Sequence, residues 1–161
     1  MKTVLIALRT LIYATGFVLL WGWVALDVRR FDGAFGFVLP AWTKILGITL
    51  TVIGGSLALI CLGFFVVRGR GTAAPFDAPR EFVAVGPYRY VRNPMYIGGV
   101  TTLFGFGLYQ GSPSILLLVV VAFVIAQLFV LFVEEPSLQH RFRSAYLEYK
   151  KSVNRWIPKW K

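Results

Sequence analysis

Residues 95–133 read MYIGGVTTLFGFGLYQGSPSILLLVVVAFVIAQLFVLFV and divide into two apolar runs. The first, residues 95–111, has 17 residues, and the second, residues 115–133, has 19. An α-helix rises about 1.5 Å per residue, so runs of about 20 residues match the ~30 Å hydrocarbon core of a membrane. Only Ser112-Pro113-Ser114 separates the two runs. The stretch therefore predicts two membrane helices joined as a tight hairpin.

Two more apolar runs precede this hairpin, at residues 4–26 and 45–67, each 23 residues long. The first exceeds the apolar region of a signal peptide, which is about 7–15 residues, and Trp21-Gly22-Trp23 stands where cleavage would fall. Tryptophans are typical of a membrane interface, so we expect this segment to be retained as a span. In the second run, Gly54-Gly55-Ser56 offers a small-residue face on which another helix can pack closely.

The sequence thus predicts an all-α integral membrane protein with about four spans in one domain, residues 1–161. A loop, residues 68–94, joins the second and third spans, and a tail, residues 134–161, follows the fourth. All but three of the 17 basic residues fall on the side shared by the N-terminus, the loop and the tail. The positive-inside rule places that side, with both termini, in the cytoplasm, and we expect a prokaryotic inner membrane. Topology accounts for the net charge of +10, and no nucleic-acid partner is expected.

Two polar motifs lie at the cytoplasmic ends of the hairpin. The first reads GPYRYVRNPMY over residues 86–96, and the second is Glu134-Glu135. Two carboxylates at the end of a helix are unfavourable, because that end already carries partial negative charge. Either arginines such as Arg89 and Arg92 or a cationic ligand should offset them. We expect the two motifs to form one site at the membrane edge.

The tail carries apolar and aromatic residues at helical spacing, with basic residues on much of the remaining surface. The apolar face comprises Leu138, Phe142, Tyr146, Tyr149 and Val153. This pattern predicts an amphipathic helix that lies on an anionic membrane surface or covers a cytoplasmic site.

Several kinds of chemistry are disfavoured by the residues themselves. The chain has one histidine, His140, and one cysteine, Cys61, so neither a metal centre nor a Ser-His-Asp triad is expected. It has no phosphate-binding GxxxxGK[ST] loop and no GxSxG elbow. What remains is a pocket of aromatics, arginines, amides and carboxylates, which would suit a small zwitterionic or cationic cofactor with an aromatic base. A helix end that is simply paired with arginines is the other interpretation.

The motifs resemble those of the isoprenylcysteine carboxyl methyltransferase and phospholipid methyltransferase superfamily, over about residues 68–158. The matching segments are Gly86–Arg89, Arg92–Gly98, Glu134–Leu138, then Phe142, Tyr146, Tyr149 and Arg155–Pro158. The resemblance implies binding of S-adenosylmethionine on the cytoplasmic side, without a metal. It also implies methyl transfer to a membrane-associated, lipophilic or small-molecule acceptor that reaches the site from the bilayer.

The resemblance also implies which residues make up the site. Cofactor contacts carry over to Phe82, Val83, Tyr88, Asn93, Pro94, Met95, Tyr96, Glu134 and Glu135. The chemistry of the residues adds Arg92 as a cofactor contact, and we expect catalytic roles for Glu134, Glu135 and Arg92. The carboxylates would hold the cofactor's ammonium or ribose or take a proton, and Arg92 would meet its carboxylate.

Two positions depart from the family pattern. Asn93 replaces the usual histidine of Arg-His-Pro, which removes a titrating base, and Val130 replaces an arginine that holds the substrate carboxylate of the prenylcysteine enzymes. Gln127 is the nearest polar residue in that span. A prenylcysteine carboxylate is therefore disfavoured as the acceptor. One alternative is an inactive scaffold of the same fold, and a more remote one is a small transporter. The spans contain almost no ionisable residues beyond Arg9, which argues against a transporter.

Overall fold

The computed structural model describes residues 2–72, 77 and 79–159, and within that part of the chain it is helical with no β-strand. Parts of the loop and tail, at residues 73–76, 78, 160 and 161, lie outside the description. Five α-helices are connected by loops and by short 3₁₀ and π turns. The elements are α1 (Lys2–Val28), η1 (Arg29–Phe35), α2 (Thr43–Phe64), η2 (Phe65–Gly69), η4 (Gly86–Arg89), α3 (Pro94–Gln110), α4 (Pro113–Phe129), η5 (Val130–Glu134) and α5 (Glu135–Ser152).

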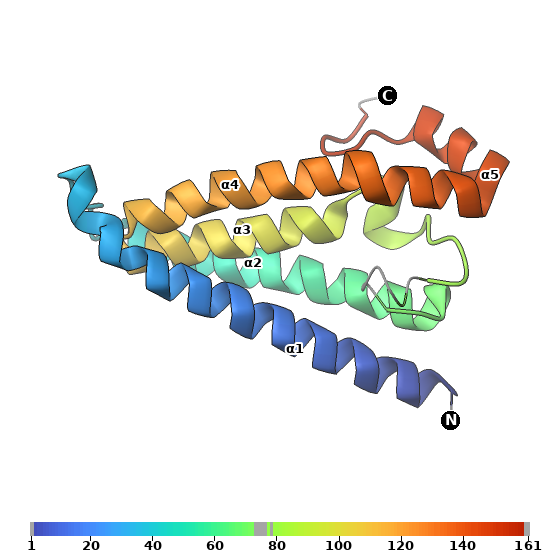
Figure 1. Ribbon diagram of the computed structural model, residues 1–161, viewed down its shortest axis with the longest axis horizontal. Helices are drawn as coiled ribbons and strands as arrows, with labels where there is room; N and C mark the ends of the chain where they lie inside the picture. Colours follow the sequence, from blue (N-terminus) through green and yellow to red (C-terminus); the bar gives the residue numbers. More distant parts are fainter. Residues whose placement is uncertain (1, 73–76, 78, 160–161) are drawn as a thin grey trace.

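Helices α2, α3 and α4 lie side by side, whereas α1 runs along their edge at an angle (Figure 1). One end of the bundle, which we call the loop end, contains residues 79–93, α5 and the start of α1 (Figure 1). At the opposite end, which we call the turn end, a short turn connects α3 to α4 close to η1. An ion pair between Arg9 and Asp77 ties α1 to the loop and gives the one arginine inside the first span a counter-charge.

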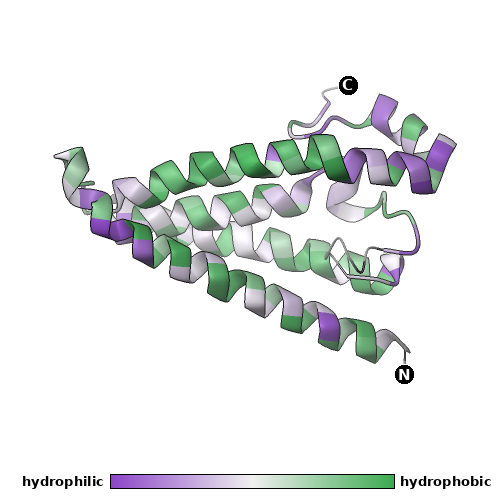
Figure 2. Ribbon diagram, in the orientation of Figure 1, coloured by the Kyte–Doolittle hydropathy of each residue, from purple (hydrophilic) through white to green (hydrophobic). Residues whose placement is uncertain are grey.

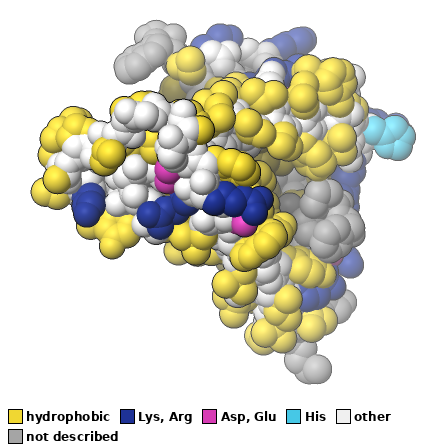
Figure 3. All heavy atoms as spheres, turned by 60° about the vertical axis from the view of Figure 1, so that its left-hand side comes forward, with side chains coloured by type: hydrophobic (Ala, Val, Ile, Leu, Met, Phe, Trp, Pro, Cys, Tyr) yellow, Lys and Arg dark blue, Asp and Glu magenta, His cyan; other side chains and the backbone are white. Residues whose placement is uncertain are grey.

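Within the described residues, three helical stretches are long and apolar enough to cross a membrane: Thr3–Phe35, Thr43–Gly69 and Pro113–Ser152. Their middle parts are hydrophobic and their ends are more polar (Figure 2). Hydrophobic side chains also cover much of the outer surface in view (Figure 3), as the many exposed large apolar residues require. These features are those of an integral membrane protein. Helix α3, with 17 residues, is about 25 Å long and is not one of these three stretches.

The most extensive helix contact joins α2 to α3, and glycines make it possible. A Cβ atom built on Gly54 would lie 2.6 Å from the carbonyl oxygen of Gly98, and one built on Gly105 would lie 2.6 Å from that of Gly47. The two backbones therefore touch at two levels. The small-residue face predicted around Gly54 is confirmed, and α3 is a continuous helix in spite of its glycines.

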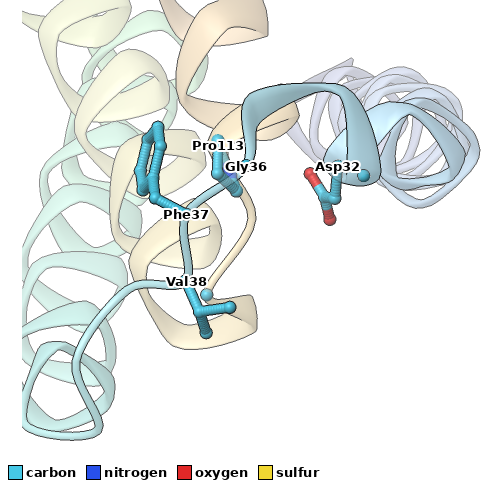
Figure 4. A pocket seen from close by; sticks show the side chains of 7 residues that line it. Asp32, Gly36, Phe37, Val38 and Pro113 are labelled. Atoms are coloured by element: carbon cyan, nitrogen blue, oxygen red, sulfur yellow. The ribbon is translucent and has the colours of Figure 1, made fainter.

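The predicted helical hairpin is confirmed, and its turn is fixed from both sides. Gly111 ends α3 in the left-handed region, with φ of 63°, and the side chain of Ser112 caps α4 by accepting from the Ile115 amide. The carboxylate of Asp32, from η1, accepts from the Ser112 hydroxyl at 2.7 Å and from the Ser114 amide at 3.0 Å. Beside this contact lies an open hollow of about 280 Å³, which is lined mainly by loop backbone and a few side chains (Figure 4).

The tail differs from the continuous amphipathic helix that the sequence predicts. Helix α5 follows α4 directly through the π turn η5, and it breaks at Arg143, whose φ is 44° and ψ is −118°. Such a conformation is strained for a residue with a Cβ atom. The break turns the second half of α5 back over the bundle (Figure 1), where Tyr146 and Tyr149 pack against Phe82.

Candidate active site

Helices α2 and α4 both pass into a π turn as they reach the loop end. Helix α2 continues as η2, which begins at Phe65, and α4 continues as η5, which ends at Glu134. A π turn inserts one extra residue per turn and changes which side chains face inward, and such turns are frequent at functional sites. Phe65, at the start of one π turn, and Glu134, at the end of the other, both line the same small cavity.

This cavity joins the two polar motifs of the sequence. Its volume is about 10 Å³, which is enough for roughly one water molecule. Its lining residues are Phe65, Tyr88, Arg92, Asn93, Met95, Tyr96 and Glu134. All of them except Phe65 are candidate site residues from the sequence. The expectation that the motifs lie together is met, and the binding roles of these residues stay predictions.

Glu134 faces the cavity with one hydrogen-bond donor. The phenol of Tyr96 donates to its Oε2 atom at 2.8 Å. Burial raises the pKa of Glu134, and the negative charge of Glu135 raises it further, while the Tyr96 hydrogen bond lowers it in part. Among the described residues no ion pair reaches this carboxylate, so its charge is held by a neutral donor alone.

Glu135, one residue later, has the opposite environment. Its side chain is 7% exposed and forms ion pairs with Arg155 at 2.7 Å, Arg92 at 2.9 Å and Lys150 at 3.2 Å. Burial alone would raise the pKa of Glu135, but the bond from Arg155, the charge of Arg92 and the contact with Lys150 outweigh burial and hold the pKa below its usual value. Two adjacent carboxylates whose environments drive their pKa values apart are typical of a division of roles.

The Arg92 side chain contacts two other residues and also lines the cavity. Its guanidinium contacts Glu135 at 2.9 Å and the Tyr146 hydroxyl at 3.4 Å, and its side chain is 10% exposed. Its Nε atom is buried without a hydrogen bond in the described part of the chain. Arg92 is therefore neutralised by Glu135 but keeps one unused donor next to the cavity. Arg89, the other arginine expected to offset the glutamates, is exposed and belongs to none of the described ion pairs.

The C-terminal residues hold the first motif in place. Backbone amides of Arg92 and Asn93 donate to the carbonyls of Asn154 and Arg155 at 2.8 and 3.2 Å. The phenol of Tyr149 donates to the carbonyl of Tyr88 at 2.6 Å. Segments about 60 residues apart in sequence are thereby fixed against each other around the cavity.

Some predicted site residues lie behind the cavity rather than on its surface. Phe82 packs among Phe142, Tyr146 and Tyr149, with ring centroids 5.1 to 6.0 Å apart. Val83 is buried in a cluster with Cys61 and Tyr88. Pro94 is fully buried in the first turn of α3, and Glu135 points into its ion-pair cluster.

Sequence reasoning gave no role in the site to Phe65, Lys150, Arg155 and Trp156, and it expected Trp156 only to anchor the tail at the membrane interface. Phe65 sits inside an apolar run and carries no signal of its own. Arg155 appears only in the ending of the family motif, although it makes the shortest contact to Glu135. Their positions depend on the backward turn at Arg143, which no periodicity reveals.

The donor set fits an organic zwitterion better than a metal. No group of three potential metal ligands occurs among the described residues. The cavity offers a carboxylate, an unused guanidinium nitrogen, an amide and the hydroxyl of Tyr88. This hydroxyl has only the Cys61 thiol as a weak partner within the described residues. These groups suit an ammonium, a carboxylate, a ribose and an aromatic base. Because the cavity has a volume of only about 10 Å³, its lining side chains must move apart before any such ligand can bind.

The sequence profile of the family described as phospholipid methyltransferase matches residues 42–145 of the chain. The chain belongs to this family of methyltransferases. The matched segment runs from the start of α2 to just before Tyr146, and so contains both motifs and every residue that lines the cavity. No curated protein matches the chain.

Proposed function

We propose that the protein transfers a methyl group from S-adenosylmethionine to a membrane-associated or lipophilic acceptor, as isoprenylcysteine carboxyl methyltransferase-like and phospholipid methyltransferase-like enzymes do. The observation that carries the proposal is the pair of adjacent glutamates with unlike environments. Glu135 takes the three basic side chains, while Glu134 keeps a carboxylate at the cavity with only Tyr96 as a donor. Such a carboxylate is free to bind a cation or take a proton.

The cofactor would be held by the residues that line the cavity. Glu134 would accept from its ammonium or ribose hydroxyls, and the unused Nε of Arg92 would donate to its carboxylate. Tyr88, Tyr96 and Phe65 supply aromatic surface for the base. When bound, S-adenosylmethionine supplies the activated methyl group.

The protein's own contribution would be alignment, exclusion of water and removal of a proton. Proper orientation of two reactants can lower a barrier by about 7–11 kcal/mol. Glu134 is the candidate acceptor for a proton lost by the methyl acceptor, because its raised pKa brings it closer to the working pH. Glu135 would act by holding Arg92 and the tail in place.

The charges around the cavity favour some classes of methyl acceptor over others. An anionic acceptor would need a cation that is not already paired, and Arg92, which lines the cavity, is engaged by Glu135 at 2.9 Å. A neutral amine or a thiol of a lipophilic molecule needs no such cation. A lipid amine is the acceptor that this balance favours.

The membrane arrangement belongs to the same proposal. In this proposal residues 1–161 form one domain with four spans, and the packing of α3 along α2 supports α3 as the fourth. An even number of spans agrees with the start of α1, the loop and the tail lying at one end (Figure 1). The excess of basic residues supports a cytoplasmic position for that end and for the site. The membrane we propose is the inner membrane of a prokaryotic cell.

Methyl transfer tests the proposal directly. Purified protein is incubated with methyl-labelled S-adenosylmethionine and vesicles that contain either lipids with a primary amine or only lipids without one, together with thiol and prenylcysteine acceptors in separate reactions. We expect label in the amine-containing lipid from the wild-type protein and none from Glu134→Gln. Transfer to every acceptor by Glu134→Gln at the wild-type rate would overturn the role of Glu134, and no transfer to any acceptor would favour the inactive scaffold.

A further inference from the structure

One contact of the tail is used by none of the roles described so far. The indole nitrogen of Trp156 donates a 2.7 Å hydrogen bond to the side-chain oxygen of Gln127. Gln127 lies within α4, whose sequence PSILLLVVVAFVIAQLF is otherwise almost entirely apolar. A polar side chain in a membrane helix is costly unless it finds a partner, and Trp156 is that partner.

The hydrogen bond fixes the indole between two other rings. Phe123, one turn before Gln127 on the same face of α4, has its ring centroid 5.1 Å from that of Trp156. On the other side, the ring of Tyr96 meets Trp156 edge to face at 6.3 Å. This is the favoured geometry for an aromatic pair. Helix α4 thus holds the indole, and the indole contacts the ring of α3 that serves the site.

Tyr96 has its functional contact at its other end. Its hydroxyl donates to Glu134 at 2.8 Å, and the ring must hold one orientation for that bond to form. Trp156 packs against the ring and restricts how far it can swing. The chain of contacts therefore runs from Gln127 through Trp156 and Tyr96 to the Glu134 carboxylate.

We propose that Trp156, anchored by Gln127, is a positioning residue that holds Tyr96 in hydrogen-bonding contact with Glu134. The inference deepens the proposed function, since it concerns the carboxylate assigned there, but the geometry on which it rests is independent of any ligand. Trp156 lies outside the segment matched by the family profile, at residues 42–145.

The test is the titration of Glu134 in the protein without cofactor. The chain has four glutamates, so carboxyl-¹³C-labelled glutamate gives few signals, and the Glu134 signal is the one lost in Glu134→Gln. The titratable and charged groups around this carboxylate are Tyr96, Glu135, Tyr88, Tyr146 and Arg92. The variants Gln127→Leu and Trp156→Phe leave all of these in place and remove only the anchor.

Loss of the anchor should loosen the Tyr96 bond, which stabilises the charged form of Glu134. We expect the apparent pKa of Glu134 to rise by about 0.5 to 1 in each variant, which is a three- to tenfold fall in its acid dissociation constant. The double variant should give no further rise, because both substitutions remove the same bond. Gln110→Leu, a glutamine at the turn end, is the matched control and should leave the titration unchanged.

An unchanged Glu134 titration in both Gln127→Leu and Trp156→Phe would overturn the inference, and so would additive shifts in the double variant. A fall in thermal stability without a change in this titration would mean a purely structural contact, which also contradicts it. Failure of wild-type protein to bind S-adenosylhomocysteine would count against the proposed function and leave this titration unaffected. The two failures are therefore distinguishable.

Discussion

The Nε atom of Arg155 donates a 2.7 Å hydrogen bond to Oε1 of Glu135, twenty residues earlier in the chain. This bond joins the tail to the end of the fourth apolar helix. Because Arg92 contacts the same carboxylate oxygen at 2.9 Å, Glu135 connects three segments at once. The neighbouring Glu134 shares none of these partners, and the two glutamates should respond differently to the same substitution.

Glu135→Gln should destabilise the protein, whereas Glu134→Gln should stabilise it slightly. The first change leaves Arg92 and Arg155 without their counter-charge, at a cost of about 2–4 kcal/mol. The second removes a partly buried charge that has no basic partner, and the amide can still accept from Tyr96. Thermal unfolding of both variants in detergent at pH 8 measures this. Equal destabilisation by both substitutions would contradict the division of roles.

Glu134 and Glu135 should also contribute to the pH dependence of stability with opposite signs. The pKa of Glu135 is lowered in the folded protein, so its contribution is present above the unfolded value and is lost as pH falls through the lower folded pKa. The pKa of Glu134 is raised, so its ionisation costs stability as pH rises from the unfolded value through the higher folded pKa. The advantage of Glu134→Gln over wild type should therefore be small near pH 4.5 and grow toward neutral pH. Melting temperatures across that range test the sign.

The contact between α2 and α3 can be tested with two neighbouring glycines. A methyl group on Gly98 would meet the Gly54 carbonyl oxygen at 2.7 Å, whereas one on Gly99 would have no atom within 4 Å. Gly98→Ala should destabilise the protein by about 1–3 kcal/mol. Gly99→Ala should be neutral or slightly stabilising, because alanine favours a helix. Similar unfolding curves for the two variants would contradict backbone contact between these helices.

The bond from Tyr149 to the Tyr88 carbonyl should contribute measurably to the closed arrangement. Tyr149→Phe removes only the hydroxyl that donates at 2.6 Å, and we expect a loss of about 1 kcal/mol. Tyr90→Phe is the matched control, because Tyr90 is 68% exposed. Hydrogen exchange of the amides at residues 91–93 should increase in the first variant only. Unchanged exchange there would show that the tail holds the loop without this bond.

Much of the helical framework follows from hydropathy and small residues. The apolar runs around Ser112-Pro113-Ser114 predict the hairpin, and Gly54 predicts the close contact with α3, because both features are local. The motif at residues 86–96 and Glu134 could be placed in one site because a hairpin returns the chain to the same end. These inferences need only the lengths of helices and the direction of the chain.

The rest depends on contacts between distant residues. The pairing of Glu135 with Arg155 and of Gln127 with Trp156 requires the chain to turn back at Arg143, and that turn is strained rather than favoured by its sequence. The π turn that ends at Glu134 changes the helical register by one residue, which periodicity does not anticipate. Tertiary packing, rather than local preference, decides each of these positions.

Calorimetric titration of the purified protein with S-adenosylhomocysteine is the most direct test of the proposed site, with Glu134→Gln beside the wild type. Glu148→Gln is the control, because Glu148 is exposed and forms none of the described ion pairs. Saturable binding by the wild type and Glu148→Gln, lost in Glu134→Gln, is the predicted result. Binding by Glu134→Gln with wild-type affinity, or no binding by a wild-type protein shown to be folded, would contradict the assignment of this cavity as the cofactor site.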